Sequence, residues 1–146
     1  MNLTLDYPPV WLIAFMVLAW VFSHFHAPLG DSALWAGRAL IGTGIGLALW
    51  AALAFRRART TIVPHQPPSA LVDSGPFQFS RNPIYVADLT VLAGWCFSVG
   101  SPLALALLIP FAWILHSRFI LPEEARLTEH LGTPYTDYRT KVRRWI

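Results

Sequence analysis

The sequence predicts an all-helical protein that crosses a membrane about four times, with a helical hairpin formed by its last two spans and short interfacial helices at its C-terminus. Hydrophobic residues make up 55% of the chain and charged residues 13%, whereas soluble domains carry about 25% charged residues. The mean hydropathy is +0.47, and the apolar residues fall into four stretches. We therefore expect one membrane-embedded domain over residues 1–146.

The first two apolar stretches run from about Pro9 to His26 and from Leu34 to Phe55. A helix rises about 1.5 Å per residue, so about 20 residues cross the hydrocarbon layer, and the second stretch reaches this length. The first is shorter. The segment before it carries Asp6 and neither Lys nor Arg, which is not typical of a signal peptide, so we expect this span to be retained.

The third and fourth stretches run from about Ile84 to Val99 and from Pro102 to Leu121. The tight connection Gly100-Ser101-Pro102 between them predicts a helical hairpin. Because the third stretch is short and carries Asp88 near its start, it is expected to tilt or to lie partly within protein. The fourth is long enough to cross the membrane.

The middle loop, from Arg56 to Asn82, is rich in proline. Proline fixes φ and removes a hydrogen-bond donor, so this loop is predicted to be an ordered, extended connection with turns near Gly75 and Pro83. Its two characteristic segments are Pro64-His65-Gln66-Pro67-Pro68 and Asp73-Ser74-Gly75-Pro76-Phe77.

Two short helices are expected after the last span. Pro122 suits the first turn of one that would end near Leu131, and Pro134 precedes the other. On the second helix and beyond it, apolar side chains are expected to face the membrane and basic side chains the phosphate head groups. The apolar set is Tyr135, Tyr138, Val142 and Trp145, and the basic set is Arg139, Lys141, Arg143 and Arg144.

Basic residues are distributed unevenly around the spans. Ten of the eleven lie around the connections that follow the second and fourth spans, and the connections after the first and third contain none. The positive-inside rule therefore predicts a cytoplasmic (inner) membrane protein with both termini in the cytoplasm. The ten are Arg56, Arg57, Arg59, Arg81, Arg118, Arg126, Arg139, Lys141, Arg143 and Arg144.

Composition also limits the partners. Cys96 is the only cysteine, which excludes an intramolecular disulfide and a multi-cysteine metal site. His24 and His26 diverge on a helix, so no metal site is predicted. The net charge of +3 belongs to residues that flank spans, with no nucleic-acid-binding motif, so membrane lipids are the expected partners and nucleic acid is not. No pattern indicates an oligomeric state.

Two adjacent carboxylates, Glu123 and Glu124, follow the last apolar stretch directly. Charged residues are costly near hydrocarbon and usually persist there for a function. The predicted hairpin brings this pair to the same membrane face as Arg81-Asn82-Pro83-Ile84-Tyr85. The sequence therefore predicts a site for a polar ligand at this face.

These residues are part of a longer pattern, which resembles the isoprenylcysteine carboxyl methyltransferase and phospholipid methyltransferase family. The resemblance covers roughly residues 60–146 and includes the order and spacing of the motifs around an apolar hairpin. The segments that carry it are Leu71-Val72-Asp73-Ser74-Gly75-Pro76-Phe77, Ser80-Arg81-Asn82-Pro83-Ile84-Tyr85, Pro122-Glu123-Glu124 and Leu131-Gly132-Thr133-Pro134-Tyr135-Thr136-Asp137-Tyr138.

The resemblance implies an integral membrane enzyme that uses S-adenosylmethionine, held in a cytoplasmic-facing pocket between the last two spans and the C-terminal segment. The eukaryotic carboxyl methyltransferases have His where this chain has Asn82. An amide does not titrate near neutral pH, so proton transfer by this residue is excluded. The cofactor contacts that the resemblance implies are Arg81, Asn82, Pro83, Tyr85, Glu123 and Glu124.

The residue types suit methyl transfer from a sulfonium. The activated group belongs to the cofactor, so the protein's task is to align donor and acceptor in a dry pocket. Glu123 or Glu124 can accept hydrogen bonds from hydroxyl or amino groups, and Arg81 or Arg118 can clamp a carboxylate. Arg118 faces the same cavity as Glu123 if the chain bends at Pro122. Arg118 and Glu123 are therefore the candidate catalytic residues.

Each assignment has a structural alternative. The helix dipole also favours the two glutamates at the start of the helix that follows the last span. It favours Asp88 in the same way near the start of the third span. The alternative for Arg81 and Arg118 is an interfacial cation, and the alternative for Tyr85 is an aromatic-belt residue. His116 is either a proton acceptor or an interfacial histidine. The segment Gly42-Thr43-Gly44-Ile45-Gly46 either contacts the cofactor or, with Gly37, lets helices approach closely, and we favour packing.

The predicted function is thus methyl transfer from S-adenosylmethionine to a lipophilic acceptor that enters sideways from the bilayer. The acceptor group is a carboxylate or an amine. The alternative from another class is a non-catalytic membrane protein that keeps this scaffold for binding or assembly. Binding of S-adenosylmethionine separates the two.

Overall fold

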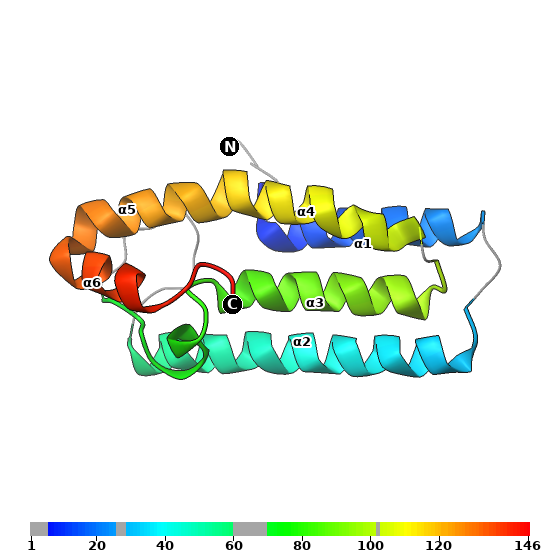
Figure 1. The fold of residues 1–146 in the computed structure, drawn as a ribbon, viewed down its shortest axis with the longest axis horizontal. Helices are drawn as coiled ribbons and strands as arrows, with labels where there is room; N and C mark the ends of the chain where they lie inside the picture. The colour runs from blue at the N-terminus through cyan, green and yellow to red at the C-terminus, as the bar shows by residue number, and fades with distance from the viewer. Residues whose placement is uncertain (1–5, 26–28, 60–69, 102) are drawn as a thin grey trace.

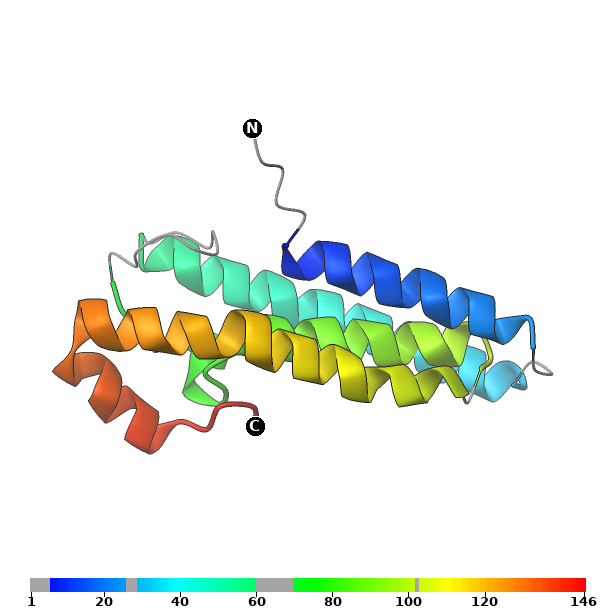
Figure 2. The ribbon, with the colours of Figure 1, turned by 90° about the horizontal axis from the view of Figure 1, so that it is seen from above.

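The computed structural model describes residues 6–25, 29–59, 70–101 and 103–146. These residues form helices and loops without a β-strand, so the predicted all-α class is confirmed for them. Four apolar helices lie side by side, and each runs antiparallel to the one before it (Figures 1 and 2). They are α1 (Pro8–Ser23), α2 (Asp31–Arg57), α3 (Pro83–Ser98) and a long helix from Leu103 to Leu131.

The long helix changes its winding along its 29 residues. A π-helical turn precedes Pro122, which cannot donate an intrahelical hydrogen bond. The wider π turn accommodates this proline without ending the helix. The helix therefore continues through Pro122, and its predicted end at Leu131 is confirmed. The four parts are η2 (Leu103–Leu107, 3₁₀), α4 (Leu108–Ile114), η3 (Leu115–Ile120, π) and α5 (Leu121–Leu131).

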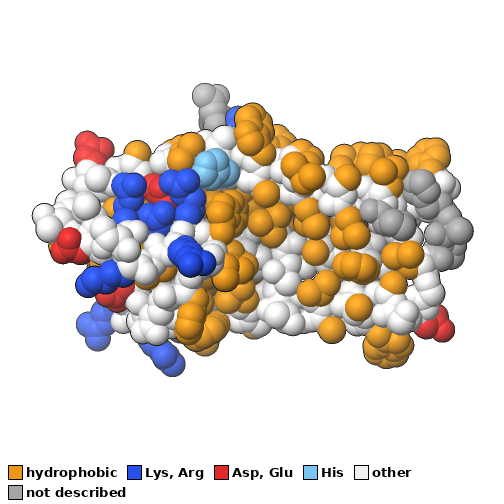
Figure 3. Space-filling model, in the orientation of Figure 1, with side chains coloured by type: hydrophobic (Ala, Val, Ile, Leu, Met, Phe, Trp, Pro, Cys, Tyr) orange, Lys and Arg blue, Asp and Glu red, His pale blue; other side chains and the backbone are white. Residues whose placement is uncertain are grey.

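Two of the described helices are long and apolar enough to cross a membrane, α2 and the helix from Leu103 to Leu131. Helices α1 and α3 have 16 residues each, or about 24 Å, which is shorter than the hydrocarbon layer of about 30 Å. Four spans therefore stay a prediction. Hydrophobic side chains cover the face over α1, α3 and α4, and most charged side chains gather at the end formed by α5, α6 and the C-terminus (Figure 3).

Glycines allow α2 and α3 to pack closely. A Cβ atom on Gly37 would lie 2.5 Å from the carbonyl oxygen of Gly94, and one on Gly44 would lie 2.6 Å from Val91 Cγ2. Cβ atoms on Gly42 and Gly46 would meet nothing within 4 Å in the described part of the chain. Close packing is thus confirmed for Gly37 and Gly44 but is wrong for Gly42 and Gly46.

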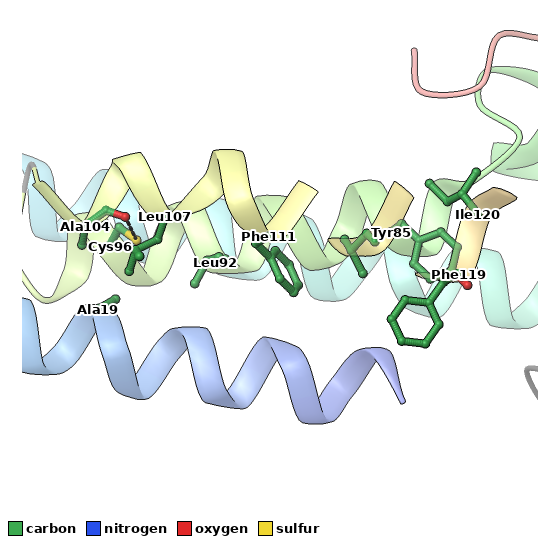
Figure 4. Packing of buried hydrophobic residues seen from close by; sticks show 10 residues of the cluster. Ala19, Tyr85, Leu92, Cys96, Ala104, Leu107, Phe111, Phe119 and Ile120 are labelled. Atoms are coloured by element: carbon green, nitrogen blue, oxygen red, sulfur yellow. Dashed lines mark hydrogen bonds between the residues drawn. The ribbon is translucent and has the colours of Figure 1, made fainter. Parts of the chain in front are cut away.

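The core between α1, α3 and α4 consists of apolar side chains (Figure 4). Leu92 and Phe111 are fully buried there. Cys96 is a buried free thiol, and its Sγ donates to the carbonyl oxygen of Ala104 at 3.4 Å. Trp95 donates its indole N–H to the carbonyl of Met16 at 2.8 Å, which joins α3 to α1.

After Gly132, whose φ is 59°, the chain reverses into α6 (Thr133–Lys141) beside α5 (Figure 1). Helix α6 confirms the second short helix, but its predicted orientation toward the membrane is wrong. Tyr135 and Tyr138 are buried within the protein, with exposed fractions of 2% and 8%. Val142 is half-buried, and Trp145 packs against the core.

Part of the middle loop supports α6. The predicted turn near Gly75 is confirmed, since this residue has a φ of 62° and begins the 3₁₀ turn η1 (Gly75–Gln78). Tyr138 donates its hydroxyl to the carbonyl of Phe77 in this turn at 2.6 Å. The segment 64–68 lies outside the described residues. Loop and α6 together therefore cover the end of the bundle where α3 begins.

Candidate functional site

A cavity of about 300 Å³ lies at the end of the bundle where α1 and α3 begin and α2 ends. Its apolar walls come from Tyr7, Pro8 and Pro9 at the start of α1, from Phe55 on α2 and from Phe77 in η1. Its polar groups come from the start of α3 and from α5. They are Arg81, Asn82, Tyr85, Asp88 and Glu123.

Five of the six predicted cofactor contacts line this cavity: Arg81, Asn82, Pro83, Tyr85 and Glu123. The predicted helical hairpin places the start of α3 and the region after the last span at the same end of the bundle. The structure has this arrangement because α5 continues past the first residues of α3 (Figures 1 and 2). The sixth residue, Glu124, lies outside the cavity lining.

Tyr85 and Glu123 are joined across the cavity wall. The hydroxyl of Tyr85 donates to Glu123 Oε2 at 3.0 Å. Tyr85 has an exposed fraction of 7%, and its ring lies 6.3 Å from the ring of Phe119. A buried tyrosine that packs in this way fixes the direction of the carboxylate, which suits Glu123 to hold a ligand group in one orientation.

Arg81, which lines the cavity, has buried hydrogen-bond donors without a partner among the described residues. Its side chain is 10% exposed, and its Nη2 lies 3.3 Å from Glu124 Oε1. Its Nε and Nη1 are buried and have no hydrogen-bond partner in the described structure. Buried donors without a partner are unfavourable and rare in folded proteins. A ligand carboxylate or carbonyl group would satisfy them.

Glu124 accepts hydrogen bonds from a second arginine. Arg144 donates from Nε to Oε1 at 3.0 Å and from Nη2 to Oε2 at 2.8 Å. The Glu124 side chain is only 8% exposed, and its hydrogen bonds raise the pKa of Arg144 above the usual value. Because α5 continues from η3, there is no free helix start here. The helix-dipole alternative for the glutamates therefore lacks its structural basis.

The last residues, 142–146, form a strap that we call the C-terminal strap. The backbone N–H of Arg81 donates to the carbonyl of Arg143 at 2.9 Å. The side-chain amide of Asn82 donates to the carbonyl of Arg144 at 2.9 Å, and the hydroxyl of Ser80 donates to the same oxygen at 3.4 Å. The strap thus holds the residues that begin α3 against α5.

Tyr135 lies near the charges of Arg81, Glu124 and Arg144. Burial raises the pKa of its phenol to about 12, and the negative charge of Glu124 contributes to the rise. Burial also raises the pKa of Tyr138 above its usual value. Both phenols therefore stay protonated at neutral pH, and the centroids of their rings lie 6.2 Å apart.

A model of the phospholipid methyltransferase family matches residues 32–134. This chain belongs to the phospholipid methyltransferase family. An uncharacterized protein of Haemophilus influenzae is 33% identical over 63 residues, which are 43% of this chain and all of that protein. Family membership confirms the resemblance found in the sequence, and it connects the cavity at Arg81 and Glu123 with a family of methyltransferases.

In this member of the phospholipid methyltransferase family, Arg118 lies apart from the cavity lining. Its Nη2 is 3.6 Å from Asp6 Oδ2, and its side chain is 50% exposed. Its guanidinium also lies over the ring of Trp11, 5.4 Å from the centroid. The helix is continuous through Pro122, and Arg118 on it contacts α1 rather than the cavity lining. A catalytic role for Arg118 stays a prediction.

Several residues of the site were missed in the sequence. The sequence predicts that Arg144 faces lipid head groups, and it gives Ser80 no role of its own. Their contacts depend on the reversal of the chain at Gly132, which brings the C-terminal strap to Asn82. His116, considered as a proton acceptor, does not line the cavity, and its Nδ1 is buried without a hydrogen-bond partner among the described residues.

Proposed function

We propose that this protein transfers a methyl group from S-adenosylmethionine to a lipophilic acceptor, a carboxylate or an amine, that reaches the cavity from the bilayer. One observation carries the proposal. In a member of a methyltransferase family, Arg81, whose buried Nε and Nη1 have no partner in the described structure, lines the same cavity as Glu123 and Tyr85.

The lining of the cavity fits the chemical groups of this donor. Its volume of about 300 Å³ is at the lower end of the usual range for ligand pockets, about 300–1,000 Å³. The free N–H groups of Arg81 suit the donor's carboxylate, and Glu123 suits its hydroxyl or amino groups. The aromatic rings of Tyr7, Phe55 and Phe77 suit a flat base. When bound, S-adenosylmethionine supplies an electrophilic methyl group on a sulfonium.

The chain's own residues would bind and orient the reactants. Tyr85 fixes Glu123, while the C-terminal strap and Glu124 hold Arg81 and Asn82. In this proposal Glu124 acts through Arg81, and Asn82 and Pro83 form part of the wall. Orientation of this kind lowers the barrier of an in-line displacement without covalent participation by the protein.

The surroundings of the cavity support a lipophilic acceptor. Helix α1, whose first residues form one wall, exposes large apolar side chains along its length, among them Ile13, Val17 and Trp20. The face over α1, α3 and α4 is hydrophobic (Figure 3). We propose that the acceptor crosses this apolar region and that Arg118, beside Trp11 on α1, contacts its polar group together with Glu123.

The proposal is tested with protein in lipid nanodiscs, S-adenosylmethionine labelled in its methyl group, and a total lipid extract from cells that express the protein. The parent should transfer label to the lipid fraction, and Glu123→Gln should transfer at least about tenfold less. Glu129→Gln is the matched control, since Glu129 is exposed on the same helix. If the parent shows no label transfer and no calorimetric binding of S-adenosylhomocysteine, the non-catalytic alternative is supported.

A further inference from the structure

Asp88 is a carboxylate on the cavity wall that the binding scheme above does not use. It lies on α3 and lines the same cavity as Tyr85 and Glu123. In the described part of the chain it makes no hydrogen bond or ion pair. Glu123, by contrast, accepts the hydroxyl of Tyr85. Asp88 is therefore the acidic group of the cavity that has no partner within the described protein.

The position of Asp88 makes an unpaired carboxylate costly. Helix α3 begins at Pro83, so Asp88 lies in its second turn, about 8 Å from the start of the helix. Stabilisation by the helix dipole falls off within the first turn, which argues against a purely local role. An ionisable side chain at the depth of a membrane helix is expensive and usually faces a partner or a pathway.

The charges around the cavity favour a positive partner. Two carboxylates, Asp88 and Glu123, and one guanidinium, that of Arg81, line it. Arg81 Nη2 lies 3.3 Å from Glu124, whose carboxylate also accepts two hydrogen bonds from Arg144, and Glu123 accepts the hydroxyl of Tyr85. The carboxylate of Asp88, which has no ion-pair partner among the described residues, lies beside the apolar walls of the cavity, where Coulomb attraction to a cation is stronger than in water.

We propose that Asp88 binds a positively charged group of a ligand, a sulfonium or an ammonium, in this cavity. The inference rests on the proposed function, and it adds a residue and a charge preference to it. Two ligands can supply such a group: the methyl donor, through its sulfonium or its amino group, and a lipophilic acceptor, through an ammonium. The sulfonium and the neutral sulfur of S-adenosylhomocysteine provide a direct comparison.

The experiment uses full-length protein in detergent, with the variants Asp88→Asn and Asp88→Glu. Asp137→Asn is the matched control, because Asp137 is exposed on α6. Calorimetry measures the affinity for S-adenosylmethionine and S-adenosylhomocysteine, and competition with a fluorescent lipid measures dodecylamine against dodecanol. Thermal unfolding shows that each variant is folded, and Asp88→Glu, which keeps the charge, should keep the preference for cations.

Three results would support the proposal, and each identifies a different positive group. A loss of at least about tenfold for S-adenosylmethionine alone in Asp88→Asn indicates the sulfonium. Equal losses for both nucleosides, restored in Asp88→Glu, indicate the donor's amino group. Unchanged nucleoside binding with a lost preference for dodecylamine over dodecanol indicates an acceptor ammonium.

Parent-like affinities for all four ligands in folded Asp88→Asn would overturn the proposal. The same holds if Asp88→Glu loses cation binding as fully as Asp88→Asn. A parent that binds neither nucleoside contradicts the proposed function instead, and in that case the comparison of dodecylamine with dodecanol still decides the role of Asp88.

Discussion

Arg144 and Glu124 form a two-point hydrogen bond between the C-terminal strap and α5, with distances of 3.0 Å and 2.8 Å. Glu124 also lies 3.3 Å from Arg81, in the loop before α3. One carboxylate thereby joins three segments that are distant in sequence. Because Arg81 lines the cavity and Glu124 does not, this carboxylate acts on the site by positioning a neighbour.

Glu124→Gln should destabilise the fold. The change leaves two arginines without their counter-charge, and breaking a buried ion pair in this way costs about 3–5 kcal/mol. Arg144 is 32% exposed, so we expect a smaller loss, about 2–3 kcal/mol, in the free energy of unfolding measured by denaturant titration. Glu129→Gln should change it by less than about 0.5 kcal/mol. Parent-like stability with weaker S-adenosylhomocysteine binding would point to direct cofactor contact by Glu124.

Arg144→Ala should release the C-terminal strap, and Arg143→Ala should not. Arg143 contributes its backbone carbonyl to Arg81, and its exposed side chain makes no hydrogen bond or ion pair within the described residues. Hydrogen exchange of the segment around Arg81 reports the docking directly, because its N–H is bonded to the strap. We expect faster exchange in Arg144→Ala alone. Equal protection in both variants would contradict a role for the Arg144 side chain in docking.

Sequence reasoning could predict the helices because their signals are local. Apolar stretches and flanking prolines locate α1, α2 and α3, and Gly132 marks the end of α5. The approach of Arg81, Tyr85 and Glu123 to one cavity also follows from a single requirement, that the start of α3 and the end of the last span lie at the same end of the bundle.

The contacts of the C-terminal strap could not be predicted in this way. The pairing of Arg144 with Glu124 depends on the angle at which α6 leaves Gly132, which no local pattern specifies. The same turn directs Tyr135 and Tyr138 into protein, although their helical spacing equally suits a membrane surface. At Pro122 the predicted helix start coincides with the first turn of α5, but the π turn η3 joins α5 to α4 in one continuous helix, which no local pattern indicated.

Glycine substitutions on α2 should separate into two classes. Gly44→Ala places a Cβ 2.6 Å from Val91 Cγ2 and 2.9 Å from the carbonyl oxygen of Ala87, and such overpacking costs about 1–3 kcal/mol. Gly42→Ala meets nothing within 4 Å among the described residues, and it should be neutral or stabilising by up to about 1 kcal/mol through helix propensity. Unfolding of both variants in the same detergent measures the difference. Equal destabilisation would contradict the close contact of α2 with α3.

Lysine substitutions should distinguish Arg81 from Arg118. A lysine keeps the charge but lacks the planar fork of arginine. Arg81→Lys should therefore bind S-adenosylhomocysteine at least about tenfold more weakly, equivalent to about 1.4 kcal/mol, because Arg81 lines the cavity and its Nε and Nη1 have no partner among the described residues. Arg118 lies outside the cavity lining, so Arg118→Lys should keep this affinity and lose label transfer by a similar factor.

The matched control for Arg118→Lys is Arg38→Lys. Arg38 also lies over a tryptophan ring, 5.0 Å from the centroid of Trp35, but near the start of α2, at the opposite end of the bundle. Arg38→Lys changes the same kind of cation–π contact at a position far from the cavity. Both variants should fold like the parent, since an exposed pair such as Arg118 with Asp6 contributes about 0–1 kcal/mol. If Arg118→Lys and Arg38→Lys both retain full turnover, Arg118 anchors α1 at the interface and has no catalytic role, whereas a loss confined to Arg118→Lys places its guanidinium at the acceptor.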